Sequence, residues 1–383
     1  MLIAGIYYLV LYRRTSTFGE EDYDTPEGCT WLRKVLLDML YERLERRSRI
    51  AEVSCRLREH GVAEAPDSTV QICAYWTPGD KYAYNATEEK LKIDEKGDTM
   101  LVYRRSERRT FEVLAQTQER YQLRLSYSDY KSTDEQEQLI HDVIAAVTGA
   151  EIVEFTTSET GVLLGLTNLD ALVEQAKAAV DPIVEATWKN MAPEERRLLS
   201  KKDFRKYLAH TLGDPSVLIN AANDDLGRMF FFHGARLDTT RVYEMDEMFA
   251  SILGGTDSLQ GKTTFWISSS LTDSYSAVCC TYTEVEDAKK AVSSAVREAM
   301  QTVSGKKKLS QQLRDSISAG MDDLRMRMQQ YSSEEVHLDS GWPLYLYFER
   351  TLSIDTESDK TVSTIIRRKL DIILDEEDES SNE

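Results

Sequence analysis

Residues 121–128 read Tyr121-Gln122-Leu123-Arg124-Leu125-Ser126-Tyr127-Ser128, with apolar or aromatic side chains alternating with polar ones. Successive side chains of a β-strand point to opposite faces, so the apolar and aromatic residues share one face and the polar residues share the other. This alternation is typical of an antiparallel strand that packs one face on a core and exposes the other to water. The stretch predicts a sheet, and it carries no motif of a recognisable chemistry.

The segments before it contain further strands joined by short turns. Lys81–Asp94 and Thr99–Ala115 have strand-like patterns and flank a short glycine-containing turn at Glu95–Asp98. The Pro-Gly pair within Trp76–Asp80 predicts another turn. Links this short cannot make the crossover that parallel strands need. The region Cys73–Tyr127 therefore predicts an antiparallel meander.

The rest of the chain alternates helix and strand patterns. The expected elements of the first half are a helix capped by Thr133 and ended by Gly149, a hairpin over Ile152–Leu166, a helix capped by Asn168, and a helix from Pro193 to about Leu212. A polar joint is expected at Pro215–Gly227. The expected elements of the second half are strands at Met229–His233, Arg241–Met245, Thr263–Ser269 and Tyr275–Tyr282, a helix capped by Thr283, a polar helix over Leu309–Tyr331, and strands at Pro343–Asp355 and Lys360–Leu374.

These patterns predict an α+β fold. We expect two similar units of curved antiparallel sheet, each packed by one to three helices, over residues 69–213 and 214–374. A strand, an amphipathic helix at Trp31–Arg47 and a linker are expected within residues 1–68, and residues 375–383 form an acidic, disordered tail. The similarity of the two halves, which suggests a duplication, is one of pattern and not of residue identity.

Composition limits the classes of function. The 383 residues carry a net charge of −19, with 41% hydrophobic and 30% charged residues, as in a soluble globular protein. A negative field repels phosphate backbones and anionic lipids, so we expect no nucleic-acid partner. The apolar run Leu2–Tyr12 is too short to span a bilayer and has its basic residues after it, unlike a signal peptide. We therefore expect neither a transmembrane span nor an export signal in the sequence as given.

No catalytic, metal-binding or cofactor motif stands out. The five cysteines form no C-x-x-C, and none of the five histidines has metal-ligand spacing with another. Gly254–Thr263 approaches a phosphate-binding loop, but its first glycine is misplaced and a strand, not a helix, is expected after it. Gly261-Lys262 is instead interpreted as a turn. We expect no enzyme, no metal and no cofactor.

Aromatic residues are the most informative candidates for a binding site. They gather at the start of the meander and at the start of the hairpin near residue 342, and the candidate ligand-binding residues are Tyr75, Trp76, Tyr82, Tyr84, Trp342, Tyr345 and Tyr347. Tyr345 and Tyr347 oppose the aliphatic face of their strand, which gives that strand apolar area on both sides. Such a sheet is either covered by helices or curves around an apolar ligand.

Two motifs also carry a resemblance to a group of proteins. Trp76–Tyr84, which contains Pro78-Gly79-Asp80-Lys81-Tyr82, and Leu338–Leu344, which contains Gly341-Trp342-Pro343, resemble β-rich bacterial envelope proteins of periplasmic or lipoprotein type. The resemblance covers about residues 70–375 and implies a non-enzymatic, extracytoplasmic protein with a curved sheet. The chain departs from that group because it shows no signal peptide and no lipidation cysteine, which leaves a cytoplasmic location as the alternative.

Two hypotheses for function follow. In the first, the chain is a binding or carrier module of the envelope that holds a hydrophobic ligand or a protein segment against a curved sheet. In the second, it is a structural or protein-interaction protein whose sheets pack only against its own helices. Whether the concave face of the sheet is open or filled distinguishes them.

Overall fold

The computed structural model describes residues 68–149, 151–191, 196, 200–250, 258–272, 274–285, 325–355 and 361–373. Its strands are β1 Thr69–Gln71, β2 Lys81–Ile93, β3 Thr99–Gln116, β4 Arg120–Ser132, β5 Ile152–Ser158, β6 Leu163–Leu166, β7 Arg236–Asp238, β8 Tyr243–Ala250, β9 Ser258–Ile267, β10 Ser276–Val285, β11 Arg325–His337, β12 Pro343–Asp355 and β13 Thr361–Ile373. Its helices are α3 Glu135–Thr148, α4 Leu169–Asn190, α6 Lys201–Leu212 and α7 Pro215–Met229. The elements expected within residues 1–67 and the acidic tail lie outside the described residues.

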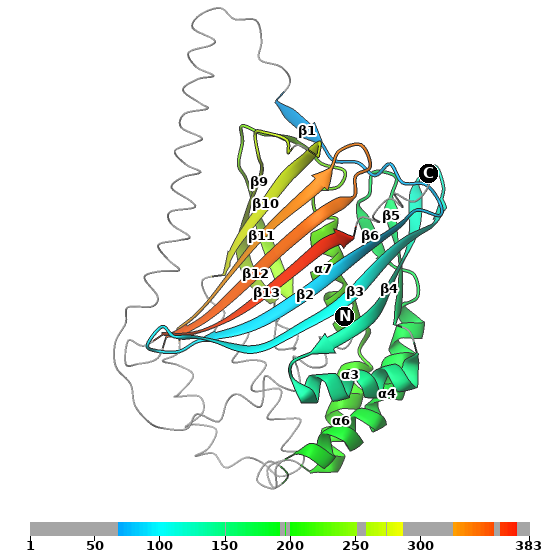
Figure 1. The fold of residues 1–383 in the computed structure, drawn as a ribbon, viewed down its shortest axis with the longest axis vertical. Coiled ribbons are helices and arrows are strands. Elements are labelled where there is room, and N and C mark those ends of the chain that lie inside the picture. Colours follow the sequence, from blue (N-terminus) through cyan, green and yellow to red (C-terminus); the bar gives the residue numbers. More distant parts are fainter. Residues whose placement is uncertain are drawn as a thin grey trace, which may run out of the picture.

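One curved antiparallel sheet dominates the fold (Figure 1). Its eleven strands follow the order β6-β5-β4-β3-β2-β13-β12-β11-β10-β9-β8. Strand β13 pairs with β2, with Leu370 opposite Ala86, so strands from both halves of the chain are neighbours. The expectation of an antiparallel sheet with helices is confirmed. The strands expected in two separate sheets form a single sheet instead, because β2 and β13 complete each other's hydrogen-bond ladders.

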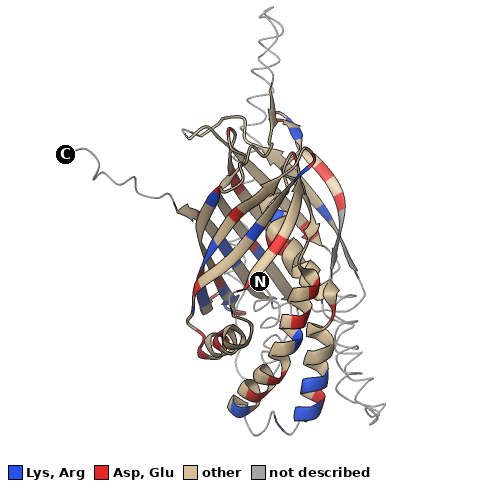
Figure 2. Ribbon diagram, turned by 90° about the vertical axis from the view of Figure 1, so that its right-hand side faces the viewer, with Lys and Arg blue, Asp and Glu red and all other residues tan. Residues whose placement is uncertain are grey.

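The strand that predicted the sheet lies in the core as expected. Leu123 and Leu125 of β4 are fully buried, and Leu123 faces Val113 of β3 and Phe155 of β5 across the sheet. Side chains at alternating positions of these strands form one apolar layer on the concave face. Both signs of charge are distributed over strands and helices in the view of Figure 2.

Helix α7 corrects the largest error of the sequence interpretation. Residues 215–227, expected to be a polar joint, form this helix, and residues 229–233, expected to be a strand, lie at its end and in the following turn. Asp214 caps it by accepting a hydrogen bond from the amide of Ser216, and Pro215 fits the first turn. The Asn-Asp-Asp run indicated a loop because such residues favour turns. Here the two acids are instead matched by cations of the sheet.

Helix α7 lies on the concave side of the sheet (Figure 1). Its apolar stripe is formed by Leu218, Ala222, Leu226 and Met229, and all four residues belong to or are buried with the main core. Their spacing of three and four residues is that of one helix face. The sheet therefore wraps around a helix of its own chain.

Three further expectations were wrong in the second half. Strand β10 continues to Val285, so Thr283 is a strand residue whose hydroxyl lies 2.8 Å from that of Thr263, not a helix cap. Strand β11 begins at Arg325, inside the range expected to be a polar helix. Gly261 and Lys262 lie within β9 and not in a turn. Polar β-strands resemble polar helices in sequence, because both lack a continuous apolar stripe.

Helices α3, α4 and α6 pack together beside the end of β4 (Figure 1). Ile140 and Ile144 of α3 are buried with Ile183 of α4 and Leu208 of α6 in a second core. The cap of α3 is Asp134, one residue after the expected Thr133, and it accepts hydrogen bonds from the amides of residues 136 and 137. Among the described helices, none is long and apolar enough to cross a membrane.

Candidate functional site

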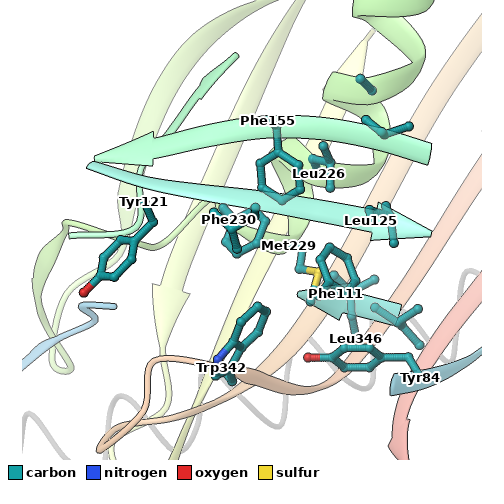
Figure 3. Close-up of a cluster of buried hydrophobic side chains, with 14 of the residues drawn as sticks. Tyr84, Phe111, Tyr121, Leu125, Phe155, Leu226, Met229, Phe230, Trp342 and Leu346 are labelled. Atoms are coloured by element: carbon teal, nitrogen blue, oxygen red, sulfur yellow. The ribbon is translucent and has the colours of Figure 1, made fainter. Parts of the chain in front are cut away.

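Four of the seven predicted site residues belong to or pack against the main core. Figure 3 shows two of them, Tyr84 and Trp342. Trp76 and Trp342 are stacked with their ring centroids 4.7 Å apart, and the ring of Tyr82 lies 4.3 Å from that of Trp342. The hydroxyl of Tyr84 donates a 2.8 Å hydrogen bond to the carbonyl of Pro343. Trp76, Tyr84 and Trp342 are each at most 2% exposed. The two motifs that stood apart in the sequence thus form one aromatic cluster.

A close backbone approach holds this cluster together. Gly341, before Trp342, has a φ of +69°, and a side chain there would place its Cβ 2.0 Å from the carbonyl oxygen of Cys73. Only glycine allows both this backbone conformation and this approach. His233 packs beside Trp76 and lies 2.7 Å through Nε2 from the carbonyl oxygen of Gly341. The two segments are therefore locked to each other by packing and by backbone contacts.

The other three predicted residues lie elsewhere. Tyr75 is 64% exposed. Tyr345 and Tyr347 are half-buried on the opposite face of β12 from Leu346 and Phe348, and the hydroxyl of Tyr347 donates to Glu349. The structure therefore does not bring the seven residues into one site.

The concave face at the aromatic end is filled. Leu226 and Met229 of α7, and Phe230 after it, pack against the cluster in the same core as Trp76 and Trp342. The apolar segment held against the curved sheet is thus α7 of the chain itself. The buried rings around Trp76 are therefore part of the protein's own hydrophobic core.

A layer of partly buried charges lies next to this apolar end and connects α7 to the sheet. Asp224 of α7 forms ion pairs with Arg228 of the same helix, with Arg350 of β12 and with Arg368 of β13. Asp225 pairs with Arg368 at 3.0 Å and with Arg109 of β3 at 3.2 Å. Helix α7 therefore contacts three strands through its two acids.

Glu88 of β2 extends this network. Its carboxylate lies 2.7 Å from Arg105 and 2.6 Å from Arg368, and it accepts a 2.7 Å hydrogen bond from the hydroxyl of Tyr103. Burial acts to raise the pKa of Glu88, but the two arginines outweigh burial and hold this pKa well below its usual value. Arg105 also pairs with Glu137 of α3 at 3.2 Å. The network thus connects α7, the sheet and α3.

The chemistry of this layer is structural. The guanidinium carbons of Arg228, Arg350 and Arg368 lie 3.8, 5.3 and 5.8 Å from the centroid of the Phe348 ring, so all three cations are also within cation–π distance of this ring. A cavity of about 40 Å³ lies among these residues, enough for ordered water but not for an organic ligand. Paired charges at such distances position α7 on the sheet.

A larger cavity, of about 180 Å³, lies between β4, α3 and α4. Tyr127, Asp129 and Tyr130 line it from β4, and His141, Ile144 and Ala145 line it from α3. Ala176 and Ala179 of α4 line the cavity as well, and their side chains are small. Glu107 of β3 and Glu151 before β5 complete the rim.

The walls of this cavity have unusual local geometry. The rings of Tyr130 and His141 are parallel within 7°, with centroids 3.9 Å apart. Asp129 has a φ of +55°, a left-handed conformation that few residues other than glycine adopt. Within the described part of the chain, the buried hydroxyl of Tyr127 has no hydrogen-bond partner. Strained backbone and unsatisfied polar groups are both more common at functional sites than elsewhere.

Burial and neighbouring charge keep the two phenols neutral. Burial raises the pKa of Tyr127 well above its usual value, and it raises the pKa of Tyr130 as well, with Glu137 adding to the second effect. Glu107 is ionised, because the attraction of Arg109 outweighs the burial that opposes ionisation and lowers the pKa of the carboxyl. The cavity therefore combines apolar walls, neutral phenols and carboxylates.

The sequence offered little to identify this cavity. Tyr127 appeared only as a core residue of β4, and His141 only as a residue beside the apolar stripe of α3. The alanines of α4 are ordinary helix formers. The lining residues come from four elements, so their meeting depends on how α3 and α4 pack on β4. Among the described residues, no cluster of side chains could hold a metal ion.

No protein-family model and no curated protein matches the chain. Among solved structures, it has a weak likeness to one described as lipid–protein interactions in lipovitellin, with a TM-score of 0.37 and 11% identity over 78% of this chain. The chain spans 25% of the lipovitellin chain. A mutant porin of Rh. blastica and Salmonella typhi OmpF in complex with daunomycin each give a TM-score of 0.19 and 8% identity over 76% of this chain. These two matches cover 100% and 98% of the porin chains, respectively. With all TM-scores below 0.5, the functions of these proteins carry no argument for this one.

Proposed function

We propose that this chain is a non-enzymatic binding module that holds one small, largely apolar ligand in the cavity between β4, α3 and α4. The observation that carries the proposal is the cavity itself, of about 180 Å³ and lined by Tyr127, Tyr130 and Ile144. An apolar protein cavity of about 150 Å³ stays dry and takes up benzene. The volume here suits a ligand of one ring with a small substituent.

Polar features of the cavity support an orienting role. Small-molecule sites are mostly apolar and have a few convergent polar groups that fix the ligand's orientation. The free hydroxyl of Tyr127 supplies such a group, since a buried hydroxyl without a partner carries an energetic cost that a ligand would remove. Asp129, which has a left-handed backbone, lines the cavity beside Tyr130.

This proposal moves the ligand from the place that the sequence suggested. The ligand lies against the curved sheet, as in the first hypothesis, but at β4 and not at Trp76, where α7 fills the concave face. The absence of a reaction and a location in the bacterial cell envelope are parts of the proposal. The location rests on the motifs at residues 76–84 and 338–344, and fractionation of the source cells tests it.

Binding of small aromatic compounds tests the function. Indole or phenol, titrated into the full chain by calorimetry, is expected to bind saturably with one site per chain. Ala145→Phe is expected to weaken this binding at least about tenfold, because Ala145 lines the cavity and the added ring would occupy it.

Ala146→Phe is the matched control, since Ala146 is the next residue of α3, is exposed, and does not line the cavity. Circular dichroism establishes that both variants fold. A wild-type chain that binds neither compound, or equal binding by a folded Ala145→Phe variant, would favour the alternative of a structural or protein-interaction protein without a small-molecule ligand.

A further inference from the structure

We infer that the ligand of this cavity is a small organic cation whose charged group lies against the carboxylates and the tyrosine rings of β4. The inference rests on the proposed function and specifies its ligand class. The first observation is the sign of the charge around the cavity. Glu107, Asp129 and Glu151 line it, and among the described residues that line it there is no Lys or Arg.

Arg109 and Arg105 act on Glu107 from outside the lining of the cavity. Arg109 is shared between two acids, Glu107 at 2.7 Å and Asp225 at 3.2 Å. One guanidinium therefore faces two carboxylates before Asp129 and Glu151 are considered. Three carboxylates and, among the described residues, no Lys or Arg therefore line the cavity, and a partly enclosed site of low dielectric strengthens their attraction for a cationic ligand.

The aromatic rings favour a cation as well. The guanidinium carbon of Arg109 lies 5.6 Å from the centroid of the Tyr127 ring, so this ring can bind a cation on its face, although the chain's own Arg109 already covers one of its two faces. Tyr130 contributes a second ring, which is held flat against His141. Aromatic rings near carboxylates recognise quaternary ammonium groups, which have no hydrogen-bond donors to satisfy. The apolar surface of Ile144 and the alanines suits the hydrocarbon part of such a ligand.

Two isosteric compounds separate charge from shape. Phenyltrimethylammonium and tert-butylbenzene differ by one nitrogen in place of carbon, and therefore by one positive charge at nearly equal size. The cation is expected to bind the full chain at least about ten times more tightly than the neutral compound, by calorimetry at low salt. Benzoate, of opposite charge, is expected not to bind. Added salt is expected to weaken the binding of the cation and to leave that of tert-butylbenzene unchanged.

A charge-removing variant locates the interaction. Asp129→Asn keeps the shape, and asparagine tolerates the left-handed backbone, so the fold is retained. This variant is expected to weaken binding of the cation about three- to tenfold without changing that of tert-butylbenzene. Glu174→Gln is the matched control, because Glu174 is an exposed acid of α4 next to the lining residue Gln175 and outside the cavity.

The outcomes distinguish this inference from the function on which it rests. Binding of tert-butylbenzene as tight as that of the cation overturns the ligand class and leaves the proposed function standing. Equal loss of cation binding in Asp129→Asn and Glu174→Gln overturns it too, because the effect would then be one of overall charge. Binding of none of these compounds, nor of indole or phenol, overturns the proposed function itself.

Discussion

Glu334 is a buried carboxylic acid without a hydrogen-bond partner among the described residues. It is 2% exposed on β11, between Cys279 of β10 and Leu346 of β12, and among the described residues neither carboxylate oxygen has a hydrogen-bond partner. Burial raises the pKa of its carboxyl well above the usual value, so the folded state favours the neutral acid. Nothing in the chemistry of the proposed cavity uses this group.

Glu334 makes a stability prediction with a definite sign. Because its folded pKa exceeds its unfolded value of about 4.5, the folded chain suffers no penalty from this group at lower pH and loses stability as the pH rises above 4.5 toward the folded pKa. Glu334→Gln removes that loss. The variant is expected to be about 1 to 3 kcal/mol more stable than the wild type at pH 8 and nearly equal to it at pH 4.5. Urea unfolding at both values measures this, and a difference independent of pH would contradict it.

At the scale of the element, α7 determines how the sheet is filled. One face of the helix packs Leu226 and Met229 into the apolar layer, and its acids are paired with arginines of β3, β12 and β13. A helix with both features cannot rotate or slide without exposing apolar area or separating charges. The same helix packs in one core with Trp76 on the concave face.

Asp224→Leu is predicted to destabilise the chain strongly. It removes the carboxylate shared by Arg228, Arg350 and Arg368, of which only Arg368 keeps other acidic partners among the described residues. Breaking a buried ion pair typically costs about 3 to 5 kcal/mol, which is the upper bound for these partly buried groups. Chemical unfolding followed by fluorescence measures the loss. Glu174→Gln, which breaks an exposed pair with Lys177, is expected to change the unfolding free energy by less than about 0.5 kcal/mol. Similar values for the two variants would show that the network does not hold α7 in place.

At the scale of the whole molecule, the ion network joins parts of the chain that are far apart in sequence. Arg368 pairs with Asp224 and Glu88, which lie 144 and 280 residues away from it. Residues of the chain's two halves thus share one polar layer as well as one sheet. We therefore expect the free energy of unfolding of the whole sheet to fall when these acids are protonated.

Acid is predicted to unfold the chain through this layer. The folded pKa of Glu88 lies far below its unfolded value of about 4.5, so the stability that it contributes is present above pH 4.5 and is lost as the pH falls toward the folded pKa. Glu88→Gln is expected to be less stable than the wild type at pH 7, by about 3 kcal/mol or more, with a shallower loss of stability between pH 4.5 and 2. Thermal unfolding across this range measures both slopes. Parallel slopes would exclude Glu88 as a source of the acid sensitivity.

Local features of the chain were predictable where they depend on neighbouring residues. The hairpin of β2 and β3, the hairpin near Gly341 and the buried face of Leu123 and Leu125 follow from two-residue alternation and turn chemistry. The clustering of aromatics near Trp76 and Trp342 was also visible, although its role as a closed core was not. The possible duplication stays a prediction.

The sequence by itself determined that this is an antiparallel α+β protein and which faces of its best strands are apolar. Tertiary structure decided that β2 pairs with β13, that residues 215–229 form a helix packed on the concave face of the sheet, and that β4, α3 and α4 enclose a cavity. Alternation and capping are local properties of the chain. Strand order, the pairing of Asp224 with Arg368 and the meeting of Tyr127 with Ala176 depend on contacts between distant residues, whose energies appear only when the elements pack.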